Sequence, residues 1–169
     1  KHEDAIYFSK RVTRAVPDGG PIEAHTNLVK KLDYECELAV VLGRDARDVP
    51  AGQTRDYIFG YTILNDVSAR DVQTAHKQWY FGKSLDGFTP IGPCIVTADA
   101  FADYPPRLGI RSFVNGEKRQ DSNTALQIFD IDHVIAELSQ GMTLKAGTII
   151  ATGTPAGVGM GMDPPQFLK

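Results

Sequence analysis

The chain has 169 residues, a length that suits one ordinary domain, and its 18 basic and 21 acidic side chains give a net charge of −3. That balance argues against a nucleic-acid partner, and no apolar run approaches the roughly 20 residues that span a membrane. Two cysteines are too few for a disulfide framework. Because Cys36 and Cys94 lie in apolar runs, we expect core residues of a reducing compartment and a cytoplasmic location.

Short segments of β-forming residues dominate the first half of the chain. We predict strands at 5–9, 34–43 and 61–64, a turn over 16–22 and a short helix over 52–59. A second helix is expected from Ser68, a suitable N-cap, to about residue 77. Lys83 follows in a glycine-containing turn after a run of aromatic residues.

The second half of the chain continues the mixture of strands and helices. We predict strands at 90–96 and 148–152, a hairpin over 108–116, a helix over 130–140 and a glycine-rich loop over 153–161. The strand at 148–152 is apolar throughout its centre, so we expect it to be buried. Nothing in the sequence divides the chain, and the order of elements predicts a β-rich α+β domain.

Three carboxylates stand where predicted strands begin or end. Glu35 and Glu37 are two positions apart on one strand, so both leave the same face with Cα atoms about 7 Å apart. Asp66 ends the next apolar strand. Oxygen-only ligands suit Mg²⁺, Mn²⁺ or Ca²⁺ and not zinc. The alternatives are that the two glutamates face solvent and that Asp66 caps the following helix.

Four further polar residues suggest a ligand site. Arg70 and Gln73 share a helix face, where a guanidinium fork and an amide suit a carboxylate. Lys83 is a candidate electrophile, and Thr154 lies in a turn whose amides suit an anion. The alternatives are a solvated helix face, a surface lysine and an ordinary turn. The sequence has no P-loop, no Rossmann glycine motif, no serine-hydrolase elbow and no HExxH zinc motif.

Five segments occur in a fixed order along nearly the whole chain: 33–41 (DYECELAVV), 60–73, 82–86 (GKSLD), 90–93 and 150–159 (IATGTPAGVG). Together they resemble the fumarylacetoacetate hydrolase family. The resemblance implies a mixed β-sandwich roll with a few short helices, a divalent ion and homodimers. It also implies cleavage of a carbon–carbon bond in a small β-dicarbonyl acid, such as an acylpyruvate or a fumarylacetoacetate-like acid.

The resemblance assigns roles to the polar residues by their motif positions. Glu35, Glu37 and Asp66 would hold Mg²⁺, or alternatively Mn²⁺ or Ca²⁺. Lys83 would touch the substrate oxygen on the metal, as the catalytic residue. The substrate's carboxylate end would be surrounded by Arg70, Gln73 and Thr154.

Other functions stay open. Within the family, the alternative is an isomerase or decarboxylase of a related 2-hydroxy-diene or oxo diacid in aromatic catabolism. From another class, the alternative is a non-catalytic β-sandwich that binds a metal or a ligand. In each enzyme reading the partner is a small-molecule carboxylate, and we expect neither a nucleic acid nor a membrane.

Three features depart from the family pattern. Family members carry a His-x-x-Glu pair that activates water on an N-terminal lid, whereas His2 and Glu3 are adjacent here. Gly87 stands where threonine is common. The strand pair expected after Lys169 is missing. We therefore expect residues 1–169 to form a single catalytic domain that lacks the N-terminal lid segment and the C-terminal strands.

Overall fold

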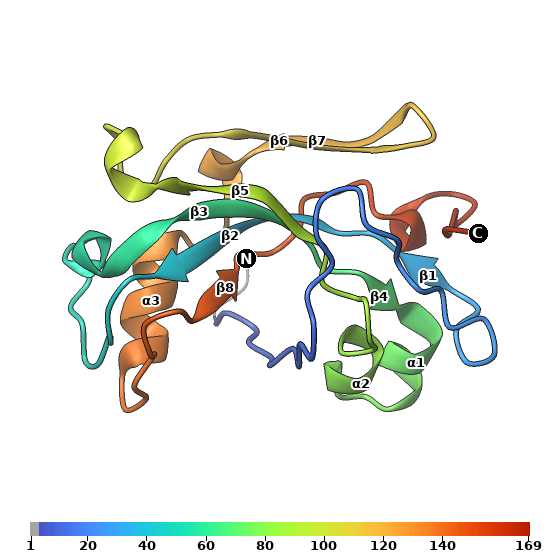
Figure 1. The fold of residues 1–169 in the computed structure, drawn as a ribbon, viewed down its shortest axis with the longest axis horizontal. Helices are drawn as coiled ribbons and strands as arrows, with labels where there is room; N and C mark the ends of the chain where they lie inside the picture. Colours follow the sequence, from blue (N-terminus) through green and yellow to red (C-terminus); the bar gives the residue numbers. More distant parts are fainter. Residues whose placement is uncertain (1–3) are drawn as a thin grey trace.

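A four-stranded antiparallel sheet forms the centre of the computed structural model, which describes residues 4–169 (Figure 1). Its strands lie in the order β5 (Ile91–Thr97), β3 (Ile58–Asn65), β2 (Cys36–Leu42) and β8 (Ile149–Ala151). The central strands β2 and β3 are mostly buried, whereas the edge strands β5 and β8 are largely exposed. The apolar runs of the two central strands therefore supply the interior of the sheet.

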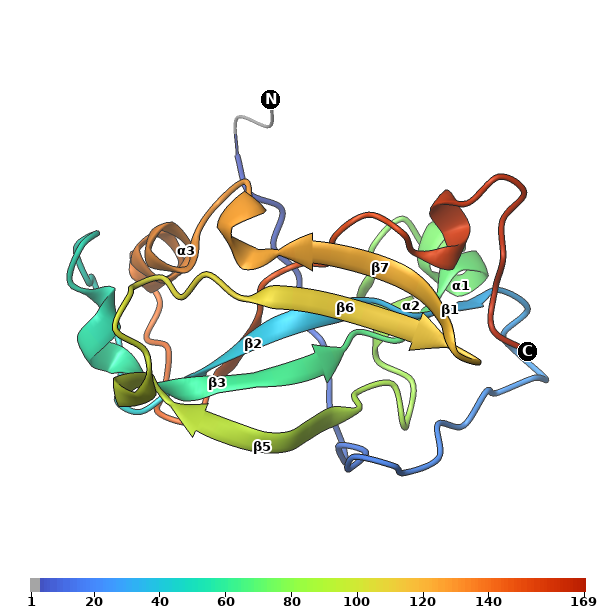
Figure 2. The same cartoon turned by 90° about the horizontal axis from the view of Figure 1, so that it is seen from above.

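Two further elements cover the faces of this sheet. The hairpin of β6 (Gly109–Val114) and β7 (Glu117–Asn123) crosses one face, as Figure 2 shows from above. Helix α3 (Ile131–Ser139) lies on the opposite side of the sheet (Figure 1). The second β layer on one face and the helix on the other cover the central strand β2, which is the arrangement of a β-sandwich with few helices.

The main core lies between β2 and α3. Leu38, Val40 and Leu42 alternate along β2 and therefore share one face of the sheet. Ile131 and Ile135 of α3 pack on that face, and both are fully buried. The alternating apolar residues of β2 thus contact the helically spaced apolar residues of α3.

A second, smaller core lies beside the first. Strands β1 (Leu32–Asp33) and β4 (Ser68–Ala69) pair with each other, and the short helices α1 (Arg70–Ala75) and α2 (Tyr80–Lys83) follow directly. Leu32, Val67, Val72 and Phe88 are among its buried residues. The start of β2 and the end of β3 therefore lie between two apolar cores. The described residues also contain four 3₁₀ turns: Thr54–Tyr57, Ala98–Ala100, Thr124–Leu126 and Gly159–Gly161.

Several predicted elements are confirmed with small changes of length. The strands predicted at 34–43, 61–64 and 90–96 are β2, β3 and β5, and the predicted hairpin is β6–β7. The turn predicted over 16–22 forms where the amide of Gly20 donates to the carbonyl of Pro17 (2.9 Å). The helix predicted over 130–140 is α3, which Asp130 caps by accepting the amide of His133 (2.8 Å).

Other predictions were wrong in the first half of the chain. Residues 5–9 form no strand, and side-chain contacts attach them to the rest of the fold: Tyr7 contacts Glu137, and Phe8 packs on Trp79 with ring centroids 5.3 Å apart. The helix predicted over 52–59 is a single 3₁₀ turn, since β3 already begins at Ile58.

The helix predicted from Ser68 to about residue 77 is confirmed as α1, Arg70–Ala75, whereas its predicted N-cap and the turn predicted around Lys83 were wrong. Ser68 lies in β4, and its hydroxyl donates to the carbonyl of Asp66 (2.8 Å) and caps no helix. Lys83 ends the helix α2 and does not lie in an open turn.

Two predictions of burial were wrong at the edges of the sheet. The strand predicted at 148–152 is reduced to β8, where Ile149 is 48% exposed, because an edge strand has a neighbour on one side only. Cys94 is exposed on the edge strand β5, whereas Cys36 on the central strand β2 is buried as expected. No helix in the described part of the chain is both long and apolar enough to cross a membrane. His2 and Glu3 lie outside the described residues.

Candidate metal centre

Strand pairing brings the three predicted acids together. Glu35 immediately precedes β2 and Asp66 immediately follows β3, and these strands pair Cys36 with Asn65. The amide of Asp66 donates to the carbonyl of Glu35 (2.9 Å), which continues the ladder by one residue. With Glu37 two positions further on, one carboxylate oxygen of each acid lies within 4.8 Å of the others.

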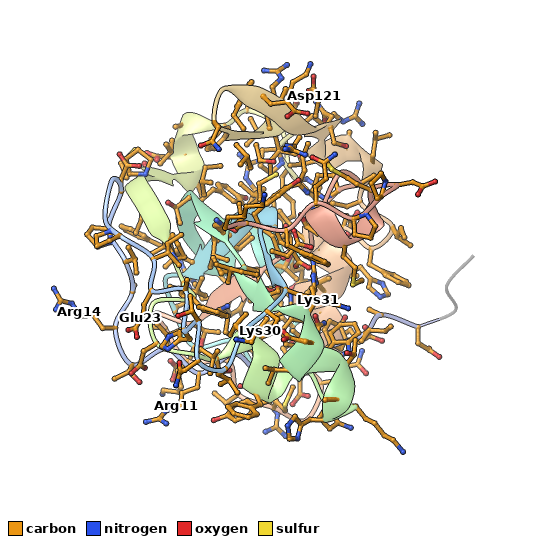
Figure 3. The ribbon with its side chains drawn as sticks, turned by 90° about the vertical axis from the view of Figure 1, so that its right-hand side faces the viewer. Arg11, Arg14, Glu23, Lys30, Lys31 and Asp121 are labelled. Carbon is orange, nitrogen blue, oxygen red and sulfur yellow. The ribbon has the colours of Figure 1, made fainter. Side chains whose placement is uncertain are left out.

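All three acids are buried inside the molecule. The exposed fraction is 8% for Glu35, 3% for Glu37 and 2% for Asp66, so the solvent-facing alternative was wrong for the two glutamates. The carboxylate of Asp66 bonds lysine side chains and caps no helix. Charged residues at the periphery are not buried in this way. All of the side chains labelled in Figure 3 are exposed: Arg11, Arg14, Glu23, Lys30, Lys31 and Asp121.

Two lysine side chains bond the acid cluster, which we define as Glu35, Glu37 and Asp66. Lys83 Nζ lies 2.8 Å from Glu35 Oε2 and 2.6 Å from Asp66 Oδ2. Lys10 Nζ lies 2.6 Å from the other oxygen of Asp66. Lys83 is only 2% exposed, so the surface alternative for it was wrong. Sequence reasoning missed Lys10, because the segment around it carries no periodic pattern or motif.

Close packing of α1 and α2 carries Lys83 to the acids. A Cβ atom on Gly82 would lie 2.5 Å from the backbone nitrogen of Gln73, so a glycine is required where the helices touch. The Lys83 ammonium also lies 5.4 Å from the ring centroid of Phe8, a cation–π contact with the N-terminal segment. The ammonium is thus held between two carboxylates and an aromatic ring.

Arg70 bonds one member of the acid cluster and two neighbouring side chains. Its NH1 lies 2.6 Å from Glu35 Oε1 and 3.2 Å from Gln73 Oε1, and its Nε lies 2.9 Å from Asp33 Oδ2. Arg70 and Gln73 are 4% and 8% exposed, which rules out the solvated helix face for both. Burial alone lowers the pKa of Arg70, but the charges of Glu35 and Asp33 outweigh it and raise that pKa.

Glu37 is the acid whose charge is least compensated. Its Oε2 accepts the amide of Gly153 (2.7 Å). Burial, followed by the negative charges of Asp66 and Glu35, raises the pKa of Glu37 to about 8. Three buried oxygen donors whose mutual repulsion opposes ionisation form a set that a divalent cation stabilises, so the residues present fit such an ion.

Thr154 lies at the edge of the same site. Its hydroxyl donates to the carbonyl of Cys36 (3.0 Å) and accepts the side-chain amide of Gln120 (2.8 Å). These contacts fix the turn that follows β8 next to the start of β2. Thr154 and Gly153 both line a cleft beside the acid cluster.

A cleft of about 950 Å³ opens beside the acid cluster. Glu37, Asp66, Lys10 and Thr154 line one part of it, and the rest is mostly apolar, with residues from α3, from 124–129 and from the N-terminal segment 5–12. Such a cleft offers charged groups for the polar end of a small acid and apolar walls for the remainder.

The whole chain is similar to known proteins. Residues 1–169 match the family model described as fumarylacetoacetate (FAA) hydrolase C-terminal. The chain belongs to the fumarylacetoacetate hydrolase family. It is 45% identical over 167 residues to the oxaloacetate tautomerase YisK of Bacillus subtilis. The matched residues make up 99% of this chain and 55% of that protein. This chain spans about half the length of the curated relatives that it matches.

Two solved structures extend the comparison. The fumarylacetoacetate hydrolase of Exiguobacterium antarcticum has a TM-score of 0.85 at 52% identity, over 88% of this chain and 53% of that chain. The fumarylpyruvate hydrolase of Pseudomonas aeruginosa, solved with Mn²⁺ and pyruvate, has a TM-score of 0.76 at 31% identity, over 86% and 64% of the two chains. The predicted family and its fold class are confirmed.

Proposed function

We propose that this chain is the metal-binding part of an enzyme that cleaves a carbon–carbon bond in a small β-dicarbonyl acid, such as an acylpyruvate. The observation that carries the proposal is the acid cluster, which is buried at the edge of a cleft and bonded by Lys83. The relative solved with Mn²⁺ and pyruvate supports both the ion and the type of acid.

Glu35, Glu37 and Asp66 are the proposed ligands of a divalent ion, Mg²⁺ in the first place and Mn²⁺ or Ca²⁺ as alternatives. When bound, such an ion acts as a Lewis acid on substrate oxygens. The carboxylates fix the position of the ion relative to the cleft. The three acids are at most 8% exposed, and this low exposure strengthens the interactions of their charges.

The chain's own residues supply the remaining groups. Lys83 is the proposed catalytic residue, because its preorganised ammonium faces the acids and can stabilise negative charge that develops on a substrate oxygen. Thr154 lines the cleft and is the proposed contact for the substrate carboxylate. Arg70 and Gln73 are proposed at that same end, although their present contacts are with the protein.

A second candidate is a tautomerase, a form of the isomerase alternative. It is supported by the 45% identity to an oxaloacetate tautomerase over 99% of this chain. Tautomerisation moves a proton without breaking a carbon–carbon bond. Decarboxylation of an oxo acid is the corresponding alternative in which carbon dioxide leaves.

One assay separates these functions. The purified protein is incubated with an acylpyruvate and with oxaloacetate, each with Mg²⁺, Mn²⁺ or EDTA. We expect metal-dependent release of pyruvate from the acylpyruvate, no release in Lys83→Met, and unchanged release in Lys118→Met, whose lysine is on the surface. Loss of the enol absorbance of oxaloacetate alone would favour the tautomerase. Tight metal binding without any turnover would favour the non-catalytic alternative.

We also propose a homodimer located in the cytoplasm. Large apolar side chains on the edge strand β5 support the dimer, since Ile95 and Val96 are each more than 40% exposed. Light scattering at micromolar concentration should give twice the mass of one chain. A monomer under those conditions would contradict this proposal.

A further inference from the structure

Asp33 is a fully buried carboxylate outside the acid cluster. It ends β1, has an exposed fraction of 0%, and receives four hydrogen bonds. Its Oδ1 accepts the amides of Tyr34 (2.9 Å) and Gly159 (2.7 Å). Its Oδ2 accepts the amide of Met160 (2.9 Å) and Nε of Arg70 (2.9 Å). A single side chain therefore joins three segments that are distant in the sequence.

The first connection leads from Asp33 to a proposed metal ligand. Arg70 bonds Asp33 through Nε and Glu35 through NH1, and both nitrogens belong to one rigid, planar guanidinium group. The NH2 of Arg70 is buried and has no hydrogen-bond partner within residues 4–169. The contact with Asp33 therefore fixes the orientation of the guanidinium group together with Gln73. The guanidinium in turn positions the Oε1 side of the Glu35 carboxylate, whose Oε2 bonds Lys83.

The second connection leads from Asp33 to the glycine-rich loop at 153–161. A Cβ atom on Gly159 would lie 2.1 Å from the carbonyl oxygen of Gln166 and 2.8 Å from Asp33 Oδ1, so the backbone approaches the carboxylate as closely as only glycine permits. At its other end, the loop donates the amide of Gly153 to Glu37. The loop is thus bonded to Asp33 at one end and to the acid cluster at the other.

We infer that Asp33 is a positioning residue of the metal centre: through Arg70 it orients Glu35, and through two backbone amides it docks the loop that orients Glu37. This inference rests on the proposed function, because it presumes that the acid cluster binds a divalent ion. Groups that orient metal ligands typically contribute 10–100-fold to metal affinity. We therefore expect Asp33→Asn to weaken Mn²⁺ binding by roughly 10–100-fold.

The variant Asp33→Asn keeps the size of the side chain but turns an amide group toward one pair of donors. Mn²⁺ alone is titrated into the full chain and followed by the loss of the free-ion signal in electron paramagnetic resonance. Asp132→Asn is the matched control, because Asp132 also accepts a glycine amide, that of Gly52 (2.7 Å), far from the acid cluster. Unaltered Mn²⁺ affinity in Asp33→Asn, or an equal loss in Asp132→Asn, would overturn the inference.

A double-mutant cycle tests the path through Arg70. Arg70→Lys keeps the positive charge but cannot bond two carboxylates through one planar group. If Asp33 acts through Arg70, the double variant loses no more Mn²⁺ affinity than the weaker-binding single variant, whereas additive losses would overturn that path. Should Asp33→Asn fail to fold, Arg70→Lys decides alone: affinity equal to that of the unaltered chain would refute the inference.

The same titration separates the two proposals. An unaltered chain that binds no Mn²⁺ would refute the proposed metal centre, and this inference with it. If both the unaltered chain and Asp33→Asn bind Mn²⁺, with equal affinity, only the role of Asp33 is refuted.

Discussion

The acid cluster and the outer face of the β6–β7 hairpin contain the same types of ion pair in different surroundings. On the hairpin, Asp121 lies 2.5 Å from Lys118 and 2.9 Å from Arg111, and these three side chains are 39–58% exposed. In the cluster, Lys83 lies at comparable distances from Glu35 and Asp66, but the three side chains are 2–10% exposed. Distance alone therefore does not distinguish the two regions, whereas burial does.

Burial changes what each charge contributes. An exposed ion pair is screened by water and salt and contributes little to stability. A buried charge that loses its partner keeps its desolvation penalty, so the remaining partner is strongly destabilising. The lysines and Arg70 bond Glu35 and Asp66, whereas burial and the charges of those two acids raise the pKa of Glu37.

The largest effect is expected for metal binding. Glu37→Gln removes one of three proposed ligands but keeps the shape of the side chain. We expect Mn²⁺ affinity to fall by more than the roughly 10–100-fold that loss of an orienting group costs. Calorimetric titration measures it, and Asp121→Asn is the control with an exposed carboxylate. Equal Mn²⁺ affinity in both variants would show that the cluster is not the metal centre.

The next effect concerns stability without metal. Lys83→Met removes the ammonium that Glu35 and Asp66 share and leaves them Arg70 and Lys10 as partners. Removing one partner of a buried ion pair costs up to about 3–5 kcal/mol. Urea denaturation in EDTA measures the free energy of unfolding. We expect the midpoint to fall sharply in Lys83→Met and to stay unchanged in Lys118→Met. Similar midpoints in the two variants would contradict the difference between the buried and exposed regions.

The sequence predicted the pairing of the acids well and their surroundings poorly. Period-two alternation places Glu35 and Glu37 on one face, and the apolar run before Asp66 predicts a neighbouring strand, so the cluster follows from local patterns. Lys10 and Asp33 meet the site through contacts across 56 and 37 positions, which no local pattern specifies.

The same reasoning explains the wrong predictions. The residue composition of 5–9 suits a strand, but side-chain contacts hold this segment without strand pairing. The apolar residues of β8 and Cys94 of β5 were expected in the core, yet strand order places both at the edges of the sheet. Propensity describes a segment alone, whereas edge or centre depends on the whole sheet.

A more gradual effect is expected from pH. The pKa of Glu37 is raised from 4.5 to about 8, so the folded chain binds a proton there that the unfolded chain releases between these values. Without metal, stability should therefore fall as pH rises from about 5 to 8, by at most about 1.4 kcal/mol per pH unit. Urea denaturation in EDTA at several pH values measures this slope. Glu37→Gln should remove that part of the slope, and an identical slope in both proteins would contradict it.

The smallest effect is expected on the hairpin. Hydrogen bonds from Lys118 and Arg111 lower the pKa of Asp121, so this carboxylate stabilises the fold above its unfolded pKa and loses that contribution as pH falls through its folded pKa. These three side chains are exposed, and at 1 M salt the screening length is about 3 Å, so salt weakens their charge interactions. Carboxyl NMR titration should therefore show the pKa of Asp121 rising toward its ordinary value in 1 M NaCl and in Lys118→Met. The pKa of Glu37 depends mainly on burial, and it should stay near 8 in the same high-salt titration. If salt moved both values equally, water would reach both carboxylates alike, and the distinction between the buried cluster and the exposed hairpin would fail.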